Sequence, residues 1–151
     1  MRAALSAGVM FGRRPDRRPH GRHLPTVLVA SGDRRQRQLL DRRLRRSGFY
    51  VRTVPDGPSA LAAAHETEPA AVVMEWIMPG TGGTAVCSRL RRHPTLHRVP
   101  VVLIAARGDS AQIAEGFRAG ADEVLTQPFE PGELITFLRR HVAWASRRGR
   151  V

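Results

Sequence analysis

Short apolar runs alternate five times with helix-like segments between residues 26 and 146, and this rhythm limits the chain to few folds. The runs at 27–30 and 71–74 are apolar throughout, which is typical of parallel strands buried on both faces of a sheet. Parallel strands joined by helices need right-handed crossovers, so the pattern predicts an α/β doubly wound parallel sheet. Periodicity alone leaves the flavodoxin-like and Rossmann-like strand orders open. The expected strands are 27–30, 49–54, 71–74, 100–105 and 122–126, and the expected helices are 34–47, 58–65, 84–93, 110–119 and 131–145.

The first expected helix has recognisable ends and a recognisable inner face. Asp33 or Ser31 before it is expected to cap its N-terminus, with Asp33 favoured, and Gly48 occupies the position after its C-terminus. Leu40 and Leu44 lie one turn apart on one face. We expect Leu39, beside them, to pack inward as well.

Length and cysteine content bound the domain organisation. The 151 residues suffice for one domain plus tails, and a domain of about 120 residues can bury a core without disulfides or metal. Cys87 is the only cysteine, which favours a reducing, cytoplasmic location. No apolar run approaches the roughly 20 residues that span a bilayer, so no membrane contact is expected. We expect a disordered basic arm at 1–25, a domain at 26–146 and a basic tail at 147–151.

The net charge of +12 suggests nucleic-acid binding, but its distribution weakens that reading. Residues 1–25 have a net charge of +5, residues 147–151 of +3, and residues 26–146 of only +4. All 25 basic residues are arginine, which fits the codon bias of a GC-rich genome. The helix at 34–47 holds seven arginines that could bind phosphates or an acidic protein, yet no nucleic-acid-binding motif accompanies them. A solvated surface is therefore the favoured interpretation.

Glu75 follows the third expected strand and precedes the turn Met78-Pro79-Gly80. This segment resembles the third strand and following loop of two-component receiver domains, in which an aspartate accepts a phosphoryl group. The resemblance covers about residues 26–142 and implies a flavodoxin-like (βα)5 sheet with strand order 2-1-3-4-5. Further stretches that resemble the family are RRSGFYV at 45–51, DGPSAL at 56–61, VPVV at 99–102, GFRAGADE at 116–123, and QPF at 127–129 followed by EL at 133–134.

The resemblance also assigns the family's phosphorylation-site positions, and all of them differ here from the family's residues. Receiver domains place a Mg²⁺-binding acidic pair after the first strand, the acceptor aspartate after the third, a hydroxyl residue at the end of the fourth, and an aromatic residue and a lysine in and after the fifth. In this chain these positions are, in that order, Ser31 and Gly32, Glu75, Ala105, Val124 and Gln127.

These replacements remove the chemistry that phosphoryl transfer needs. One certain carboxylate is a poor Mg²⁺ site, and no lysine or hydroxyl remains to stabilise the charge of the transferring group. We therefore expect no metal, no cofactor, no catalytic residue and no enzymatic activity. Glu75 is interpreted as a solvated carboxylate, with a fixed charge that imitates phosphorylation as the alternative. In the family the peptide bond before Pro128 is cis, which gives Gln127 a structural role.

The sequence thus predicts a stand-alone, atypical (degenerate) receiver protein that acts through phosphorylation-independent contact with a protein partner, possibly as a homodimer. The alternatives are a phosphoryl-accepting regulator with a site rebuilt around Glu75, a basic nucleic-acid-associated protein, and a sensor of a small ligand in the vacated pocket. In the family, partners dock on the surface formed by the helix at 110–119, the strand at 122–126 and the helix at 131–145. The residues expected on that surface are Arg118, Asp122, Glu123, Glu133, Phe137 and Arg140.

Overall fold

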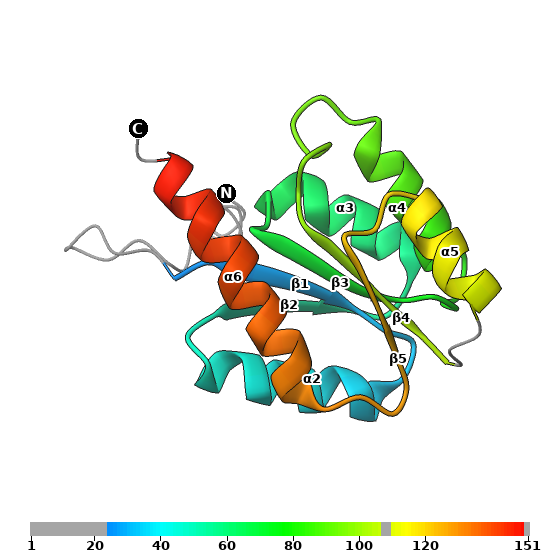
Figure 1. Cartoon of the computed structure of the whole chain (residues 1–151), viewed down its shortest axis with the longest axis horizontal. Coiled ribbons are helices and arrows are strands. Elements are labelled where there is room, and N and C mark those ends of the chain that lie inside the picture. Colours follow the sequence, from blue (N-terminus) through cyan, green and yellow to red (C-terminus); the bar gives the residue numbers. More distant parts are fainter. Residues whose placement is uncertain (1–23, 107–109, 150–151) are drawn as a thin grey trace, which may run out of the picture.

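A five-stranded parallel sheet with helices on both faces forms the domain in the computed structural model (Figure 1). The structure describes residues 24–106 and 110–149, with side chains up to residue 142. Its strands are β1 (Thr26–Ala30), β2 (Tyr50–Val54), β3 (Ala71–Glu75), β4 (Val101–Ala105) and β5 (Glu123–Thr126), and its helices are α2 (Arg34–Arg46), α3 (Gly57–Thr67), α4 (Gly83–Arg91), α5 (Ser110–Arg118) and α6 (Pro131–Gly149).

The strand order is β2-β1-β3-β4-β5, which confirms the flavodoxin-like prediction. β1 pairs with both β2 and β3, and its register sets Val27 opposite Ala71 and Ala30 opposite Met74. Alternate residues of the buried strands face opposite sides of the sheet, so each side has its own apolar core. Helices α2 and α6 cover one side, and α3, α4 and α5 cover the other (Figure 1).

The ends of α2 lie where the sequence predicts them. The Asp33 carboxylate accepts a hydrogen bond of 2.9 Å from the backbone N–H of Arg35, which caps the helix. Gly48 has a φ of 98°, the left-handed conformation that glycine adopts without a Cβ clash. Leu40 and Leu44 are buried as expected.

The prediction for Leu39 is wrong, because its side chain is 43% exposed. Successive residues of a helix are rotated by about 100°, so Leu39 lies well off the stripe formed by Leu40 and Leu44. It is an apolar residue at the rim of the α2 surface rather than a part of the core.

Element ends otherwise differ from the predictions by one or two residues, except at the C-terminus. Helix α6 continues to Gly149, four residues beyond its expected end and into the predicted basic tail. Of the arm predicted at 1–25, only Leu24 and Pro25 belong to the described residues. Within the described part of the chain, no helix combines the length and apolar character that crossing a membrane requires.

Candidate functional site

The carboxyl ends of the parallel strands meet at one edge of the sheet, and the candidate site lies there. β1 and β3 are neighbours, so Ser31 after β1 and Glu75 at the end of β3 come to the same level. In an open α/β sheet this edge, beside the point where the strand order reverses, is where ligands bind.

Ser31 is a structural residue of the turn into α2. It is 1% exposed, and its backbone N–H donates to the Val54 carbonyl at 3.1 Å. Its Oγ accepts the backbone N–H of Asp33 at 3.0 Å, and its carbonyl accepts Arg37 Nη1 at 2.7 Å. The hydroxyl is therefore engaged in holding the cap residue in place.

Gly32 lies against the loop that follows β3. A Cβ at this position would be 3.1 Å from Cδ of Pro79 and 3.8 Å from the Pro55 carbonyl oxygen. That first distance is tighter than ordinary carbon–carbon contact, so a carboxylate side chain here would require the loop to move by a few tenths of an ångström.

The Glu75 carboxylate is bound by a side chain that the sequence analysis did not identify. Its Oε2 accepts a hydrogen bond of 3.3 Å from Nε2 of Gln36 in α2. A sequence signal for this contact exists, because Gln36 lies four residues before the buried Leu40 and so shares its inward face. Glu75 is half-buried and linked to α2 through this hydrogen bond.

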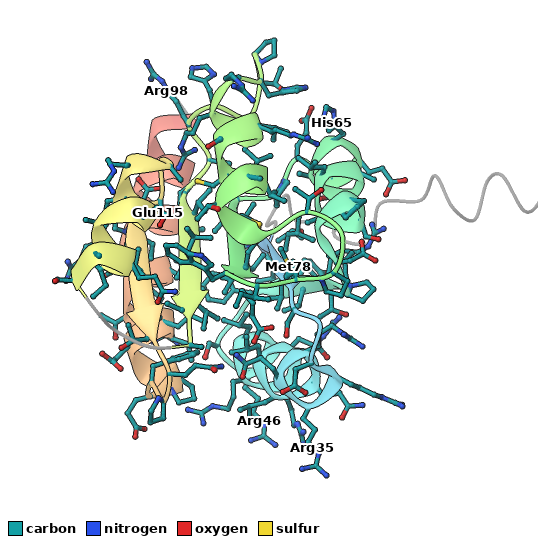
Figure 2. The ribbon with its side chains drawn as sticks, turned by 90° about the vertical axis from the view of Figure 1, so that its right-hand side faces the viewer. Arg35, Arg46, His65, Met78, Arg98 and Glu115 are labelled. Atoms are coloured by element: carbon teal, nitrogen blue, oxygen red, sulfur yellow. The ribbon has the colours of Figure 1, made fainter. Side chains whose placement is uncertain are left out.

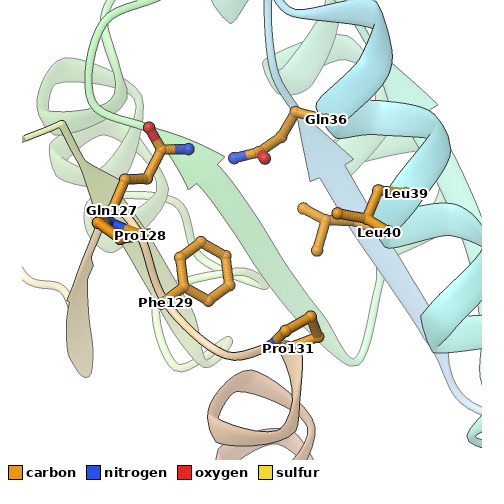
Figure 3. A pocket seen from close by; sticks show the side chains of 7 residues that line it. All are labelled: Gln36, Leu39, Leu40, Gln127, Pro128, Phe129 and Pro131. Carbon is orange, nitrogen blue, oxygen red and sulfur yellow. The ribbon is translucent and has the colours of Figure 1, made fainter.

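Gln127 and Ala105 are joined through the backbone at the other side of this edge. The Gln127 N–H donates to the Ala105 carbonyl at 2.9 Å, and the peptide bond from Gln127 to Pro128 is cis, as the resemblance implied. The Gln127 amide extends toward Gln36 across an open groove of about 430 Å³ (Figure 3). The groove is lined by Gln36, Leu39, Leu40, Gln127, Pro128, Phe129 and Pro131.

Val124 on β5 is 9% exposed and lies against a glycine of α5. A Cβ on Gly116 would be 2.8 Å from Cγ2 of Val124 and 3.0 Å from Cζ3 of Trp76. Trp76 directly follows Glu75, and both of its backbone polar groups are hydrogen-bonded. Its N–H donates to the Ile104 carbonyl and its carbonyl accepts the Gly83 N–H, each at 2.8 Å. The indole thus occupies the space between the end of β3, α5 and β5, a role that the sequence analysis missed.

Comparison with known proteins identifies the family of this domain. A model of the response regulator receiver domain matches residues 27–139. The chain belongs to this family. It is 32% identical over 112 residues to the phosphate regulon transcriptional regulatory protein PhoB of Rhizobium meliloti (strain 1021), covering 74% of this chain and 49% of that protein. It is 35% identical over 113 residues to the transcriptional regulatory protein CseB of Streptomyces avermitilis, covering 75% of this chain and 47% of that protein.

Solved structures of response regulators have the same fold. A response regulator from Chloroflexus aurantiacus J-10-fl superposes with a TM-score of 0.75 at 33% identity, covering 79% of this chain and 98% of that one. The Francisella response regulator 1452 receiver domain superposes with a TM-score of 0.76 at 27% identity, covering 80% and 98%. The chain spans about half the length of the curated relatives it matches.

The residues of this receiver domain do not fit the Mg²⁺ ion that the family binds. At the acidic-pair positions the Ser31 hydroxyl is already bonded within its turn, and Gly32 has no side chain. Asp33 caps α2 and Asp56 caps α3, so Glu75 is the carboxylate left to face a cation among the described residues that end or follow β1, β2 and β3. An octahedral Mg²⁺ site usually rests on carboxylate oxygens from more than one residue. Among residues 24–106 and 110–142, no cluster of three or more metal-binding side chains occurs.

Three of the six side chains predicted on the docking surface already have hydrogen-bond partners within the domain. The Asp122 carboxylate accepts Arg91 Nη2 at 2.9 Å and the Val101 N–H at 2.8 Å, which ties α4 to the sheet. Glu123 accepts the Val124 N–H at 3.1 Å, and Glu133 accepts the Glu130 N–H at 3.1 Å.

The remaining three predicted residues lie on α5 and α6. Phe137 is half-buried and stacks on His141 with ring centroids 3.9 Å apart. Arg118 lines a hollow between α4 and α5, whereas Arg140 is exposed on α6. Phe117 on α5, which the sequence analysis did not single out, is 45% exposed and is the large apolar side chain that this region offers to a partner.

Proposed function

We propose that this receiver domain works in signal transduction through phosphorylation-independent contact with a protein partner. The observation that carries the proposal is the set of residues around Glu75 at the carboxyl edge of the sheet. We call this edge the acceptor edge. Glu75 is paired with the Gln36 amide, and the acidic pair, the hydroxyl and the lysine of the family are replaced by Ser31, Gly32, Ala105 and Gln127. Without charge-stabilising groups, the site offers little help to a phosphoryl transfer that depends on them.

The packing around Trp76 supports a second part of the proposal, namely that the α5–β5 region keeps one arrangement. The indole and Val124 both lie close to the bare Gly116 backbone, so α5 sits directly on them. A ligand shifts a conformational equilibrium only if it binds one state better than the other. The described residues at the acceptor edge form no cluster of three or more metal-binding side chains, so they give no reason for Mg²⁺ to favour a second position of α5.

The test is a set of two-dimensional amide NMR spectra of the full chain. Adding Mg²⁺ and beryllofluoride, an analogue of the phosphoryl group, should leave the amide signals of α5 and β5 unchanged. A matched control carries Ser31→Asp, Gly32→Asp, Glu75→Asp, Ala105→Thr and Gln127→Lys, which restore the family's residues. Large shifts in the unmodified chain would support the alternative of a phosphoryl-accepting regulator rebuilt around Glu75.

The same spectra separate the two interpretations of Glu75. If the carboxylate of Glu75 only accepts the hydrogen bond from the Gln36 amide, Glu75→Gln should shift the amide signals near α2 and leave those of α5 and β5 unchanged. Shifts that extend through Trp76 to α5 would instead show that the negative charge imitates the phosphorylated state.

A further inference from the structure

Helix α2 carries a concentration of positive charge that the acceptor edge does not explain. Its 13 residues hold seven arginines and one acid, Asp41, for a net charge of +6. The other residues between 26 and 146 hold nine arginines and eleven acids, for a net charge of −2. Codon bias toward arginine decides which basic residue is used and not where it lies, so it does not account for this clustering.

Three of these arginines form a straight stripe on the solvent side of α2. Arg35, Arg42 and Arg46 are exposed and are spaced by seven and four residues, which brings them to one face opposite Leu40 and Leu44. The stripe is about 16 Å long at 1.5 Å per residue. Arg35 and Arg46 extend away from the domain (Figure 2).

Unlike those of Arg37 and Arg45, the side chains of the stripe arginines have no hydrogen bond inside the described part of the domain. Arg37 binds the Ser31 carbonyl, and Arg45 binds both Asp41 and the Val51 carbonyl. Within the described part of the chain, the structure shows no such bond for Arg35, Arg42 or Arg46. The side chains are therefore available to an external anion.

The stripe has opposing effects on the stability of α2, because only Arg46, in the last turn, complements the helix dipole. The first turn contains no acidic residue, and Arg35 in that turn opposes the helix dipole. Arg42 and Arg46 are like charges at i and i+4, which repel each other. The three stripe arginines neither cap α2 nor link it to the rest of the described domain, which points to a role in binding an external anion.

We propose that the stripe of Arg35, Arg42 and Arg46 binds the phosphate backbone of duplex nucleic acid, in addition to the protein contact proposed above. A duplex carries one negative charge per about 1.7 Å of its axis, so a stripe of this length meets phosphates in any sequence. Guanidinium groups match phosphate oxygens in geometry as well as charge. An acidic protein would need carboxylates at matching positions, whereas a duplex carries phosphates along its whole length.

Two further observations favour this partner. The one acid of α2, Asp41, is neutralised by Arg45 at 2.8 Å, so it does not oppose an approaching polyanion. The sequence adds net charges of the same sign at both ends of the chain, +5 in residues 1–25 and +3 in residues 147–151. The contact would be independent of base sequence, because it reaches the backbone only.

The experiment measures fluorescence anisotropy of a labelled duplex of about 20 base pairs with the full chain, between about 50 and 200 mM salt. The variant combines Arg35→Gln, Arg42→Gln and Arg46→Gln. The control combines Arg89→Gln, Arg92→Gln and Arg98→Gln, which removes the same charge from exposed side chains of α4 and the loop after it. Glutamine and arginine have similar helix propensities, so both proteins should fold, as circular dichroism verifies.

We expect the stripe variant to bind the duplex at least about tenfold more weakly than the intact chain at the lowest salt. The affinity of the control variant should fall by less than about threefold. The slope of log K against log salt should become shallower by about 2.7 for three lost phosphate contacts. Replacing the three arginines with lysine should keep the slope. The proposal fails if the intact chain binds no duplex at the lowest salt, or if both glutamine variants lose the same amount of affinity for the duplex. It also fails if polyglutamate binds as tightly as the duplex, which would point to an acidic protein.

Discussion

Gly116→Ala tests whether the indole of Trp76 really sits against α5. In an open helical position this substitution stabilises a protein by about 1 kcal/mol, because alanine has the higher helix propensity. Here the new Cβ would be 2.8 Å from Cγ2 of Val124 and 3.0 Å from Cζ3 of Trp76, so both neighbours must move. Overpacking of this kind costs about 1–3 kcal/mol. We expect a net loss of about 1 kcal/mol in the free energy of unfolding.

The assay is urea denaturation followed by circular dichroism, with Gly132→Ala as the matched control. A Cβ on Gly132 meets nothing within 4 Å, so that variant should be neutral or slightly more stable. In a Val124→Ala background the nearest atom is absent, and Gly116→Ala should cost about 1 kcal/mol less than in the unmodified chain. A Gly116→Ala protein that gains stability in the unmodified background would refute the packing of Trp76 described above.

Three further predictions concern single side chains. Leu44→Ala should lower the free energy of unfolding by about 2–5 kcal/mol, because Leu44 is buried, whereas Leu39→Ala should change it by no more than about 0.5 kcal/mol, because Leu39 is 43% exposed. Equal losses in urea titrations would contradict the assigned inner face of α2. Burial raises the pKa of the Cys87 thiol to about 11, so at pH 8 almost no reactive thiolate forms, and iodoacetamide should label Cys87 only after denaturation. Hydrogen bonds with Ser59 lower the pKa of Asp56 below its usual 3.8, so this cap stabilises the fold above that value and is lost as the pH falls through the lowered pKa; an NMR titration of Asp56 that gives 3.8 or higher would disprove it.

The fold could be predicted from sequence because strand rhythm, helix ends and the family resemblance agree. Buried runs such as 71–74 fixed the strands, and Asp33 and Gly48 marked the ends of α2 correctly. The strand order came from the resemblance, because periodicity carries no information about which strands are neighbours. Leu39 was misplaced because adjacency in sequence was taken for adjacency on the helix face.

The site could be predicted only as a set of positions. Gln36 and Trp76 were missed because their roles depend on contacts with segments distant in sequence, with Glu75 in one case and Gly116 in the other. The same holds for Asp122, whose bonds to Arg91 and Val101 join three elements. Matching a motif shows which position of the family a residue occupies. The hydrogen bonds of that residue depend on the side chains around it in this chain, which the motif does not describe.

The central claim is that Glu75 does not accept a phosphoryl group, and intact-mass spectrometry tests it most directly. The full chain is incubated with acetyl phosphate and Mg²⁺, beside the variant in which the five family residues are restored. Our account predicts an unchanged mass for the unmodified chain, because its acceptor edge lacks the acidic pair, the hydroxyl and the lysine. A phosphoprotein peak in the unmodified chain that disappears in Glu75→Gln would contradict the account.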